Sequence, residues 1–411
     1  MRFMKLGATA LAGVFLAAGA MTPAALAQQP IATVSKAMAG AFTEANAAIA
    51  AKDWPTAKAK LTAAYAAAKL PAEKLAVEQT RVQVAAHMQD WASLITHVGA
   101  IEALNLLPAA DMKTYRGVVA ESYKNLNDIP NYLTAQKAYL DQYGGTHDVL
   151  AVFANDLVKA NDNAAAISYV DQAIAAARTS GVKPPESYYR LKARALNATG
   201  DKAGYYKVIE TVVAEYPNDD YWRELIVLRA QNEAGYDAAT VRLDMYRTLV
   251  ASGIKLTPQD KSNIGREAIR RGLPQEALNI LDPAIASGEL GSEQVDKDNL
   301  ATAKRRVGED KPNLAKETQE IVKEGNASAM AAIGEAHLSY GDNAKAIEVL
   351  KAALDKGISN AGEADLARLH LGIAQYRSGD KAAAQATWAT IKANNGAAVF
   401  AQNWTLISNL K

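Results

Sequence analysis

Apolar residues recur along this chain with the spacing of amphipathic helices, in runs that are separated by short polar breaks. Within a run they return every three or four positions, which places them on one face of a helix, as in residues 367–378 and 381–393. The break between these two runs is Gly379-Asp380-Lys381. Glycine suits the left-handed residue that ends a helix, and the aspartate after it can accept hydrogen bonds from the next helix's first amides. The pattern therefore predicts helix pairs joined by tight turns.

The breaks return at a nearly constant interval. Nine intervals between Asp53 and Asp380 have a mean of about 36 residues, which is typical of stacked helix-turn-helix units. The sequence thus predicts an all-α fold, a right-handed helical-repeat solenoid of about ten units over residues 28–395. The breaks are Lys52-Asp53-Trp54, Gln89-Asp90-Trp91, Asn127-Asp128-Ile129, Asn161-Asp162-Asn163, Gly200-Asp201-Lys202, Gly235-Tyr236-Asp237, Gly272-Leu273-Pro274, Gly308-Glu309-Asp310, Gly341-Asp342-Asn343 and Gly379-Asp380-Lys381.

Pairs of small residues twelve positions apart mark the predicted seam between the two helices of a unit. A side chain larger than methyl at either position would push the two backbones apart, so these positions predict a close helix-helix approach. Bulky residues nearby are expected to fill the remaining space. The pairs are Gly265 with Ala277, Gly334 with Ala346 and Gly372 with Ala384, and the bulky residues are Leu281, Leu350, Trp388, Leu371 and Ile333.

These positions resemble the tetratricopeptide repeat family, in which small residues stand seven before and five after the turn glycine. An aromatic residue or leucine follows four positions later, and three units of this chain match at all of these places. The resemblance implies a superhelix that binds other proteins. Between about residues 200 and 320 the pattern departs, and an irregular superhelix is expected there. The departures are Gly204, Tyr205, Tyr236, Thr240 and Asn313.

Four segments of the second half resemble a narrower group, the periplasmic tetratricopeptide proteins encoded beside ExbB, ExbD and TonB. They are residues 184–189, 215–222, 272–274 and 370–374. This resemblance implies an accessory role in proton-driven transport across an outer membrane.

The first 27 residues have the form of a secretory signal peptide. Arg2 and Lys5 precede an apolar run that ends at Met21, and Ala25-Leu26-Ala27 has the small-x-small form that signal peptidase accepts. Cleavage after Ala27 predicts a periplasmic protein, and a retained membrane anchor is the less favoured interpretation. No later stretch reaches 18 apolar residues, so no stable membrane insertion is expected after cleavage. The absence of cysteine excludes a lipoprotein and any disulfide.

The last segment, residues 396–411, carries several large apolar side chains. An open solenoid end would expose apolar surface, so this segment is expected to form a helix that caps the last unit. The less favoured use is as a helix that docks a partner.

Composition and motifs point away from nucleic acid and from catalysis. The chain has 45 Lys+Arg and 44 Asp+Glu, a balance that provides no electrostatic reason to bind nucleic acid. Its five histidines are scattered and form no His-Glu-x-x-His metal motif. There is no cysteine, no Gly-x4-Gly-Lys-Ser/Thr phosphate loop and no Gly-x-Ser-x-Gly elbow. We therefore expect a protein that is not an enzyme and needs no metal or cofactor.

Candidate binding residues recur at one register in three consecutive units. Arg194, Arg229 and Arg266 each stand six residues before a turn glycine, in the helix that would line the concave face. Guanidinium and amide groups can hold a carboxylate or a peptide backbone, and the arrangement resembles the carboxylate-gripping grooves of some tetratricopeptide domains. The alternative is a solvated face with ion pairs to Glu224, Glu233 or Glu267. The full predicted partner-binding set is Arg190, Arg194, Asn197, Trp222, Arg229, Asn232 and Arg266.

Trp222 belongs to a cluster of aromatic residues in the same region, most of which are expected in the core. Its place beside Arg229 on a first helix predicts that it lies in the groove. The sequence as a whole predicts a non-catalytic periplasmic scaffold whose partners are proteins or peptide segments of the cell envelope. The alternatives are an accessory of a TonB/ExbB/ExbD-type system and a non-catalytic partner of a cell-envelope enzyme.

Overall fold

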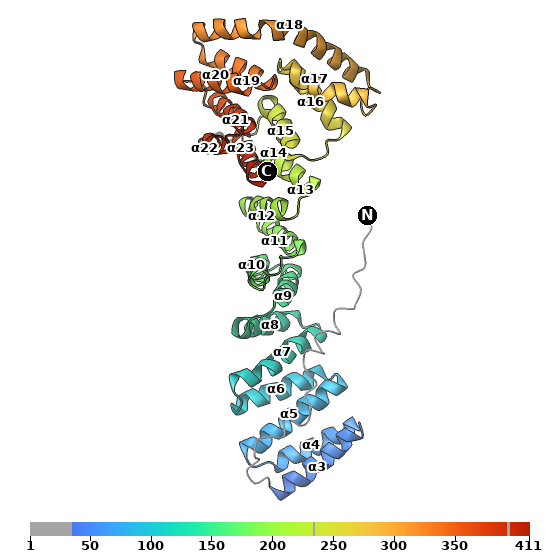
Figure 1. The fold of residues 1–411 in the computed structure, drawn as a ribbon. Coiled ribbons are helices and arrows are strands. Elements are labelled where there is room, and N and C mark those ends of the chain that lie inside the picture. The colour runs from blue at the N-terminus through green and yellow to red at the C-terminus, as the bar shows by residue number, and fades with distance from the viewer. Residues whose placement is uncertain (1–34, 233–234, 393–394) are drawn as a thin grey trace. The chain divides into compact units, whose positions relative to one another are not determined.

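The computed structural model describes residues 35–232, 235–392 and 395–411 (Figure 1). Over these ranges the regular secondary structure is helical, with no strand, and successive helices pair. The predicted all-α helical-repeat solenoid is confirmed. The predicted signal peptide, residues 1–27, lies outside the described residues. Among the helices of the described ranges, none combines the length and the apolar character that a membrane crossing requires.

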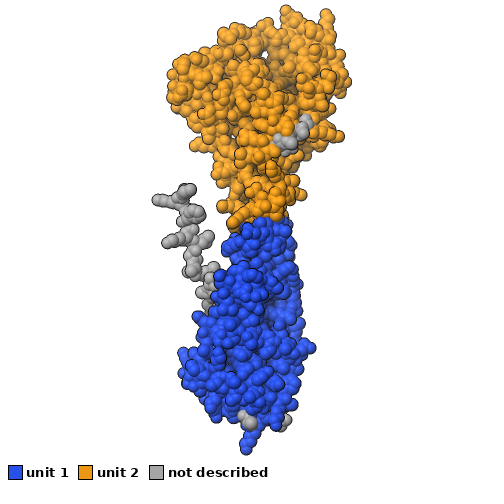
Figure 2. Space-filling view, turned by 180° about the vertical axis from the view of Figure 1, so that it is seen from behind, with its two compact units in different colours: residues 1–184 blue, residues 185–411 orange. Residues whose placement is uncertain are grey.

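The chain divides into two compact units, residues 1–184 and 185–411 (Figure 2). In the first unit each helix packs mainly against the next along the chain, as stacked hairpins do. Its helices are α3 (Lys36–Ala50), α4 (Trp54–Ala67), α5 (Pro71–Met88), α6 (Trp91–Leu104), α7 (Ala109–Asn125), α8 (Ile129–Tyr143), α9 (His147–Lys159) and α10 (Asn163–Thr179).

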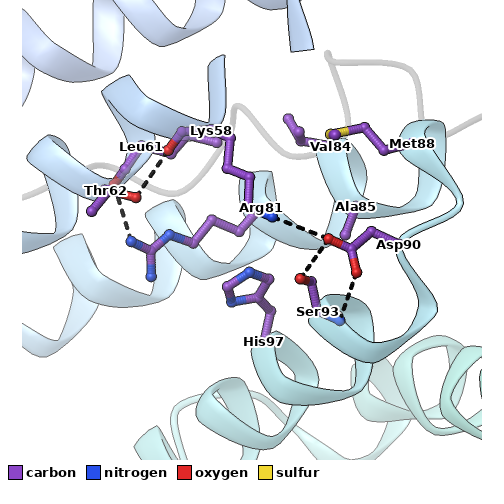
Figure 3. Close-up of a pocket in the computed structure, with 10 residues that line it drawn as sticks. All are labelled: Lys58, Leu61, Thr62, Arg81, Val84, Ala85, Met88, Asp90, Ser93 and His97. Atoms are coloured by element: carbon purple, nitrogen blue, oxygen red, sulfur yellow. Dashed lines mark hydrogen bonds and ion pairs between the residues drawn. The ribbon is translucent and has the colours of Figure 1, made fainter. Parts of the chain in front are cut away.

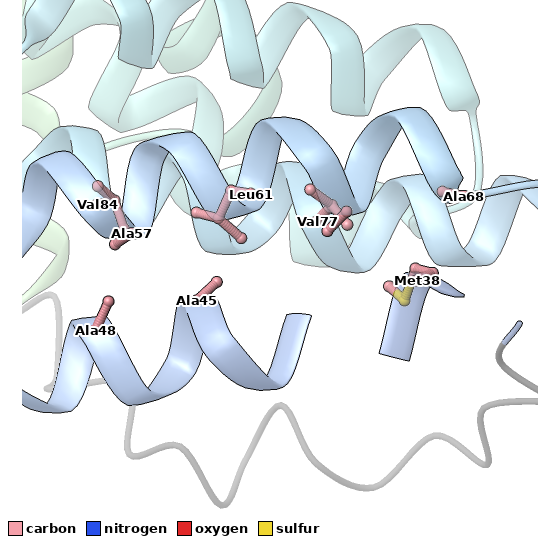
Figure 4. Close-up of a cluster of buried hydrophobic side chains, with 9 residues drawn as sticks. Met38, Ala45, Ala48, Ala57, Leu61, Ala68, Val77 and Val84 are labelled. Carbon is pink, nitrogen blue, oxygen red and sulfur yellow. The ribbon is translucent and has the colours of Figure 1, made fainter. Parts of the chain in front are cut away.

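Small residues let these helices lie close together. In the first hairpin, Ala45 of α3 and Ala57 of α4 are fully buried, and they belong to one apolar cluster with Leu61 of α4 and Val77 of α5 (Figure 4). Alanine on both helices leaves little side chain between the backbones, so the larger leucine and valine fill the remaining space. This packing explains how a chain that is rich in alanine can still form a hydrophobic core.

The predicted turn chemistry is present at most of the breaks. The aspartate side chain accepts a hydrogen bond from a backbone amide in the first turn of the following helix, as Asp380 does from Ala383 at 2.9 Å. The same cap is made by Asp53, Asp90, Asp128, Asp162, Asp201, Asp237 and Asp342. The residue before the cap often has positive φ, for example 89° at Gly379 and 64° at Asn161. These caps fix where each helix begins.

The predicted break at Gly308-Glu309-Asp310 is wrong. Gly308 lies inside α18 (Gln294–Glu324), a single helix of 31 residues that also contains Pro312. Apart from the neighbouring backbone of α18 itself, no described atom lies within 4 Å of the position that a Cβ of Gly308 would occupy, so no second helix packs there to make a hairpin. Lys, Arg and Glu around the glycine are good helix formers, and they outweigh its cost of about 1 kcal/mol in a helix.

The remaining helices of the second unit are α11 (Glu186–Thr199), α12 (Lys202–Glu215), α13 (Asp219–Arg223), the π-helical turn η1 (Glu224–Leu228), α14 (Arg229–Gln231), α15 (Ala238–Ser252), α16 (Pro258–Arg270), α17 (Pro274–Ala286), α19 (Ala327–Ser339), α20 (Asn343–Lys356), α21 (Ala361–Arg377), α22 (Lys381–Trp388) and α23 (Ala397–Leu410). The π-helical turn and the long α18 both fall between residues 200 and 320, where the sequence predicted irregularity.

The C-terminal helices of the second unit return to α15. Helix α23 packs on α21 and α22, as a terminal cap would, and it also contacts α15, α14 and η1 (Figure 1). Trp404 of α23 is fully buried, and its ring centroid lies 5.9 Å from that of Trp388 in α22. Through α23, the last repeats are therefore packed against the chain's own α15.

The predicted seams between small and large residues are also confirmed. A Cβ placed on Gly265 would lie 2.6 Å from the Leu281 side chain, and one on Gly334 would lie 2.7 Å from Leu350 Cγ. Trp388 packs in the same way over Gly372, and its Nε1 donates to the Leu369 carbonyl at 3.2 Å. Each glycine thus accommodates the bulky residue sixteen positions later.

Replacing Gly334 by leucine should lower the free energy of unfolding by about 1–3 kcal/mol, because the new side chain overlaps Leu350 in a closed seam. Thermal and urea unfolding followed by circular dichroism would measure the change. Gly308→Ala is the matched control, since that glycine is helical with open space around it, and it should stabilise by about 0.5–1 kcal/mol. Equal midpoints for Gly334→Leu and the wild type would contradict the seam.

Candidate functional site

An open groove of about 550 Å³ runs between α11, α12 and the start of α13, within the second unit. We call it the tyrosine groove, because Tyr189, Tyr205 and Tyr221 line it, one from each helix. Ile209 and Val212 of α12 supply apolar floor. A groove of this size, with amphipathic rings and a few charged groups, can hold several residues of an extended peptide.

The cationic wall of the groove comes from one face of α11. Arg190, Arg194 and Asn197 follow one another at intervals of about one helical turn and all line the groove. All three are exposed. Across the described ranges, neither arginine has an ion-pair partner within 4.0 Å or a side-chain hydrogen bond, so their donors are open to a ligand. The sequence predicted these three residues on the binding surface, and the structure places them in one groove.

The tyrosines of the groove are held by carboxylates. The Tyr221 hydroxyl donates to Glu186 at 2.6 Å, the Tyr189 hydroxyl to Glu215 at 2.9 Å, and the Tyr205 hydroxyl to Glu224. Burial and the Glu186 carboxylate raise the pKa of Tyr221 to about 12, so its hydroxyl stays a neutral donor at any physiological pH. Fixed hydroxyls orient the rings, which lowers the entropy that a ligand would lose when it packs on them.

Trp222 is not in the groove, contrary to the prediction from the sequence. Its side chain is 7% exposed and belongs to the core, whereas the adjacent Tyr221 faces the groove. Neighbouring residues on a helix point about 100° apart, and here Tyr221 takes the groove side while Trp222 takes the core side. The aromatic residue of α13 that a ligand would meet is therefore Tyr221.

Arg229 and Asn232 lie outside the tyrosine groove. Arg229 donates to Glu210 at 2.5 Å and to the side chain of Gln402, and its guanidinium lies 5.4 Å from the Tyr206 ring centroid. Asn232 donates to the Tyr206 hydroxyl at 3.2 Å. The π-helical turn η1 explains the change, because the Arg229 amide bonds to Glu224, five residues earlier, and everything after it is rotated relative to an α-helix.

Arg266 lies on α16 and is exposed, donating to Asn263 at 2.5 Å. It is not among the residues that line the tyrosine groove. The three arginines at one register thus do not form a continuous ladder: Arg194 lies in the groove, Arg229 is used in an ion pair, and Arg266 stands apart. The alternative of a solvated or paired face holds for the last two, although neither pairs with Glu224 or Glu267.

A smaller pocket of about 140 Å³ lies in the first unit between α4, α5 and α6 (Figure 3). Its polar wall contains Lys58, which pairs with Asp90 at 3.1 Å, and Ser93, whose hydroxyl donates to Asp90 at 2.6 Å. The hydrogen bonds from Ser93, together with Lys58, lower the pKa of Asp90 to about 2. Because the Ser93 hydroxyl is committed to a charged carboxylate, it is not placed as a nucleophile toward His97.

The second unit contains a buried charged cluster that the sequence analysis missed. Arg247 of α15 donates at 2.8 Å to Asp244 of the same helix, at 2.8 Å to Glu335 of α19 and at 2.7 Å to Glu276 of α17. His370 of α21 joins the cluster, with Nε2 at 2.9 Å from Asp244. No motif could have revealed it, since its members come from four helices spread over 127 residues of sequence.

The donor set of this cluster superficially suits a metal. Ligand atoms of Asp244, Glu335 and His370 lie within 4.8 Å of one another, and all three residues are buried. However, Nη1 of Arg247 lies 2.8 Å from both carboxylates and 3.2 Å from His370 Nε2, which is the place a shared ion would need. Arg271 adds a second guanidinium, 2.7 Å from Glu335. The cation that these ligands hold is arginine, and the cluster joins α15 to the helices around it.

Acid should loosen this cluster. Burial opposes the charge on Asp244 and on Glu335, but His370 and Arg247 outweigh it and lower the pKa of both carboxyls below their ordinary values. Such groups contribute stability above their unfolded pKa, about 4, and the contribution is lost as pH falls toward the folded value. We expect the urea midpoint to fall between pH 5 and pH 2, and Asp244→Asn to reduce that slope. An unchanged slope in the variant would contradict the role of the carboxylate.

Comparison with known proteins returns the repeat type and no individual relative. No protein-family model matches the chain, and no curated protein matches it. Solved structures similar to it include a tetratricopeptide repeat protein from Parabacteroides merdae ATCC 43184, with a TM-score of 0.30 and 11% identity over 66% of this chain and 99% of that one. Yeast Tom70 scores 0.24, with 10% identity over 91% and 96%.

A third similar structure is the TPR2AB domain of yeast Sti1 in complex with pHSP90, with a TM-score of 0.23 and 12% identity over 73% of this chain and all of that one. Two of these three similar structures, the Parabacteroides merdae protein and the Sti1 domain, are named as tetratricopeptide repeat structures. The fold itself is established by the helix pairs, caps and seams of this chain. Together with the tyrosine groove, they define a helical-repeat protein with an open site for a ligand.

Proposed function

We propose that this chain is a protein-interaction scaffold of the bacterial periplasm and that its tyrosine groove binds an extended segment of an envelope protein. The observation that supports the groove most is the pair of exposed arginines, Arg190 and Arg194, which have no hydrogen-bond or ion-pair partner among the described residues and line the same groove as the tyrosines. Arginine and tyrosine are the residues that most often dominate protein interfaces.

The chemistry of the groove favours binding over catalysis. None of the described residues that line it is a histidine or serine, and two of its three carboxylates accept hydrogen bonds from tyrosine. This arrangement offers donors, acceptors and ring faces of the kind that hold a ligand. The periplasmic location is supported by the signal-peptide pattern of residues 1–27.

The narrower role, as an accessory of a TonB/ExbB/ExbD-type system, rests on the four sequence segments that resemble such proteins. The role as non-catalytic partner of a cell-envelope enzyme predicts a different client. Identification of the captured protein separates the two.

The groove can be tested by crosslinking in cells, affinity capture and mass spectrometry. The triple variant Arg190→Ala, Arg194→Ala and Asn197→Ala should keep the wild-type melting temperature, since all three side chains are exposed, and should lose the captured partner. The matched control is Arg266→Ala with Arg305→Ala, which removes two exposed arginines far along the chain from the groove. The same partner recovered in equal yield from all three proteins would refute docking in the tyrosine groove.

A further inference from the structure

Positive and negative side chains lie at different ends of the tyrosine groove, and this separation of charge limits the ligands that can bind there. Resting on the proposed function, we infer that the groove selects an extended peptide segment carrying an acidic and a basic residue about four positions apart. The groove is not simply basic, because it holds three carboxylates, Glu186, Asp220 and Glu224, against the two arginines of α11. A uniformly acidic chain end would meet repulsion at one end of it.

The positive end is formed by Arg194 and Asn197 in the last turns of α11. The Arg194 guanidinium has five N–H donors and, among the described residues, no acceptor, so it can bind a carboxylate in a bidentate manner. Asn197 is placed about one turn further on and adds an amide that can bond to a peptide backbone. This end is complementary to an acidic side chain or a terminal carboxylate.

The negative end is formed where α11 and α13 begin. Among the described residues, the Glu186 carboxylate accepts only the Tyr221 hydroxyl, at 2.6 Å, and a carboxylate has about four lone-pair sites, so acceptor capacity remains. Within the described part of the chain, the Asp220 carboxylate has no hydrogen bond and no ion pair, although Asp220 lines the groove. Glu224, which follows α13, instead binds the Tyr205 hydroxyl near the start of α12, so Glu186 and Asp220 carry the charge of this end. This end is complementary to a lysine or arginine.

The helix itself sets the spacing between the two ends. Glu186 and Arg194 are eight residues apart on α11, which corresponds to about 12 Å along the axis at 1.5 Å per residue. An extended peptide advances about 3.3–3.6 Å per residue, so about four residues cover the same length. Arg190 stands midway, one turn from each. Its charge opposes the rise in the pKa of Tyr221, which places Arg190 near the negative end and leaves Arg194 as the outer cation.

The experiment is a peptide library displayed against the full chain, in which one acidic and one basic residue are fixed at spacings of one to eight positions in randomised backgrounds. Acid-only, base-only and uncharged libraries provide the comparison. We expect enrichment to peak near a spacing of four in either order, with affinity about two- to fivefold above the uncharged set for each charge, as exposed ion pairs contribute. Enrichment that ignores spacing, is highest for acid-only peptides or is absent would overturn the inference.

Two variants assign the ends. Arg194→Gln should remove the preference for the acidic residue and keep that for the basic one, whereas Asp220→Asn should do the opposite. Glu320→Gln, an exposed acid on α18, is the control and should change neither. If the alanine variants of the groove lose the partner in cells but peptide charge spacing has no effect, the docking function stands and this inference fails. If the alanine variants of the groove retain the partner in cells, the proposed docking function is itself wrong, whatever the peptide libraries show.

Discussion

Arg247→Met should destabilise the second unit by about 3–5 kcal/mol, because it leaves Asp244, Glu276 and Glu335 close together without their shared cation. Methionine is shorter than arginine but is unbranched and of similar volume, so the loss would report charge more than volume. The side chain of Arg247 is 3% exposed, and water cannot replace the guanidinium without opening the packing around α15. Urea unfolding followed by tryptophan fluorescence measures the change.

Arg266→Met is the matched control, since that arginine is exposed and, within the described part of the chain, its side chain bonds only to Asn263; it should stay within about 0.5 kcal/mol of the wild type. A double-mutant cycle with Asp244→Asn tests the pairing directly. If the cluster acts as one network, the double variant loses less than the sum of the two single losses. Additive losses, or an Arg247→Met protein as stable as the control, would show that the cluster does not hold α15.

The buried cluster also bears on which surface is available to partners. In a simple superhelix, the first helices of successive units line an open concave face. In the second unit, by contrast, Glu335 of α19 and His370 of α21 are bonded to Arg247 and Asp244 of α15. That part of the face is therefore filled by the chain itself. The tyrosine groove on α11 precedes this region of the chain. Its arginines therefore remain exposed, whereas Arg247 is buried in ion pairs.

The parts of the fold that depend on neighbouring residues could be predicted from the sequence. The cap at Asp380 and the packing of Leu350 over Gly334 require only a helix, a turn and a second helix, so a repeated local pattern reveals them. Arg190, Arg194 and Asn197 share one face because they lie on one regular helix. These predictions succeed where helical geometry alone fixes the outcome.

Predictions that depend on a uniform register failed where the backbone departs from it. The π-helical turn at Glu224–Leu228 rotates Arg229 away from the surface that its spacing suggested. At Gly308 the glycine met no packing partner, and the helix continued through it. The cluster around Arg247 joins residues that are up to 126 positions apart, and a single sequence contains no periodic signal for such contacts.

Trp404→Ala should lower the free energy of unfolding by about 3–5 kcal/mol and should weaken the packing of α23 on both α15 and α22. Trp404 is 1% exposed, and its ring lies 5.8 Å from that of Tyr376 and 5.9 Å from that of Trp388. Removing the indole leaves a large cavity under α23, the helix that covers α21 and α22 and also contacts α15. We therefore expect a single unfolding transition at lower urea, with loss of the near-ultraviolet signal of Trp388 in the same transition.

Two further variants separate the cavity from other causes. Trp404→Phe keeps an aromatic ring and removes an indole N–H that has no hydrogen-bond partner among the described residues, so it should lose clearly less than the alanine variant. Leu410→Ala, at the exposed end of the same helix, should stay within about 0.5 kcal/mol of the wild type. A Trp404→Ala loss no larger than that of Leu410→Ala would mean that α23 is dispensable to the core. The packing of α23 on both α15 and α22 predicts a much larger loss for Trp404→Ala, because the buried Trp404 ring holds α23 in contact with both helices.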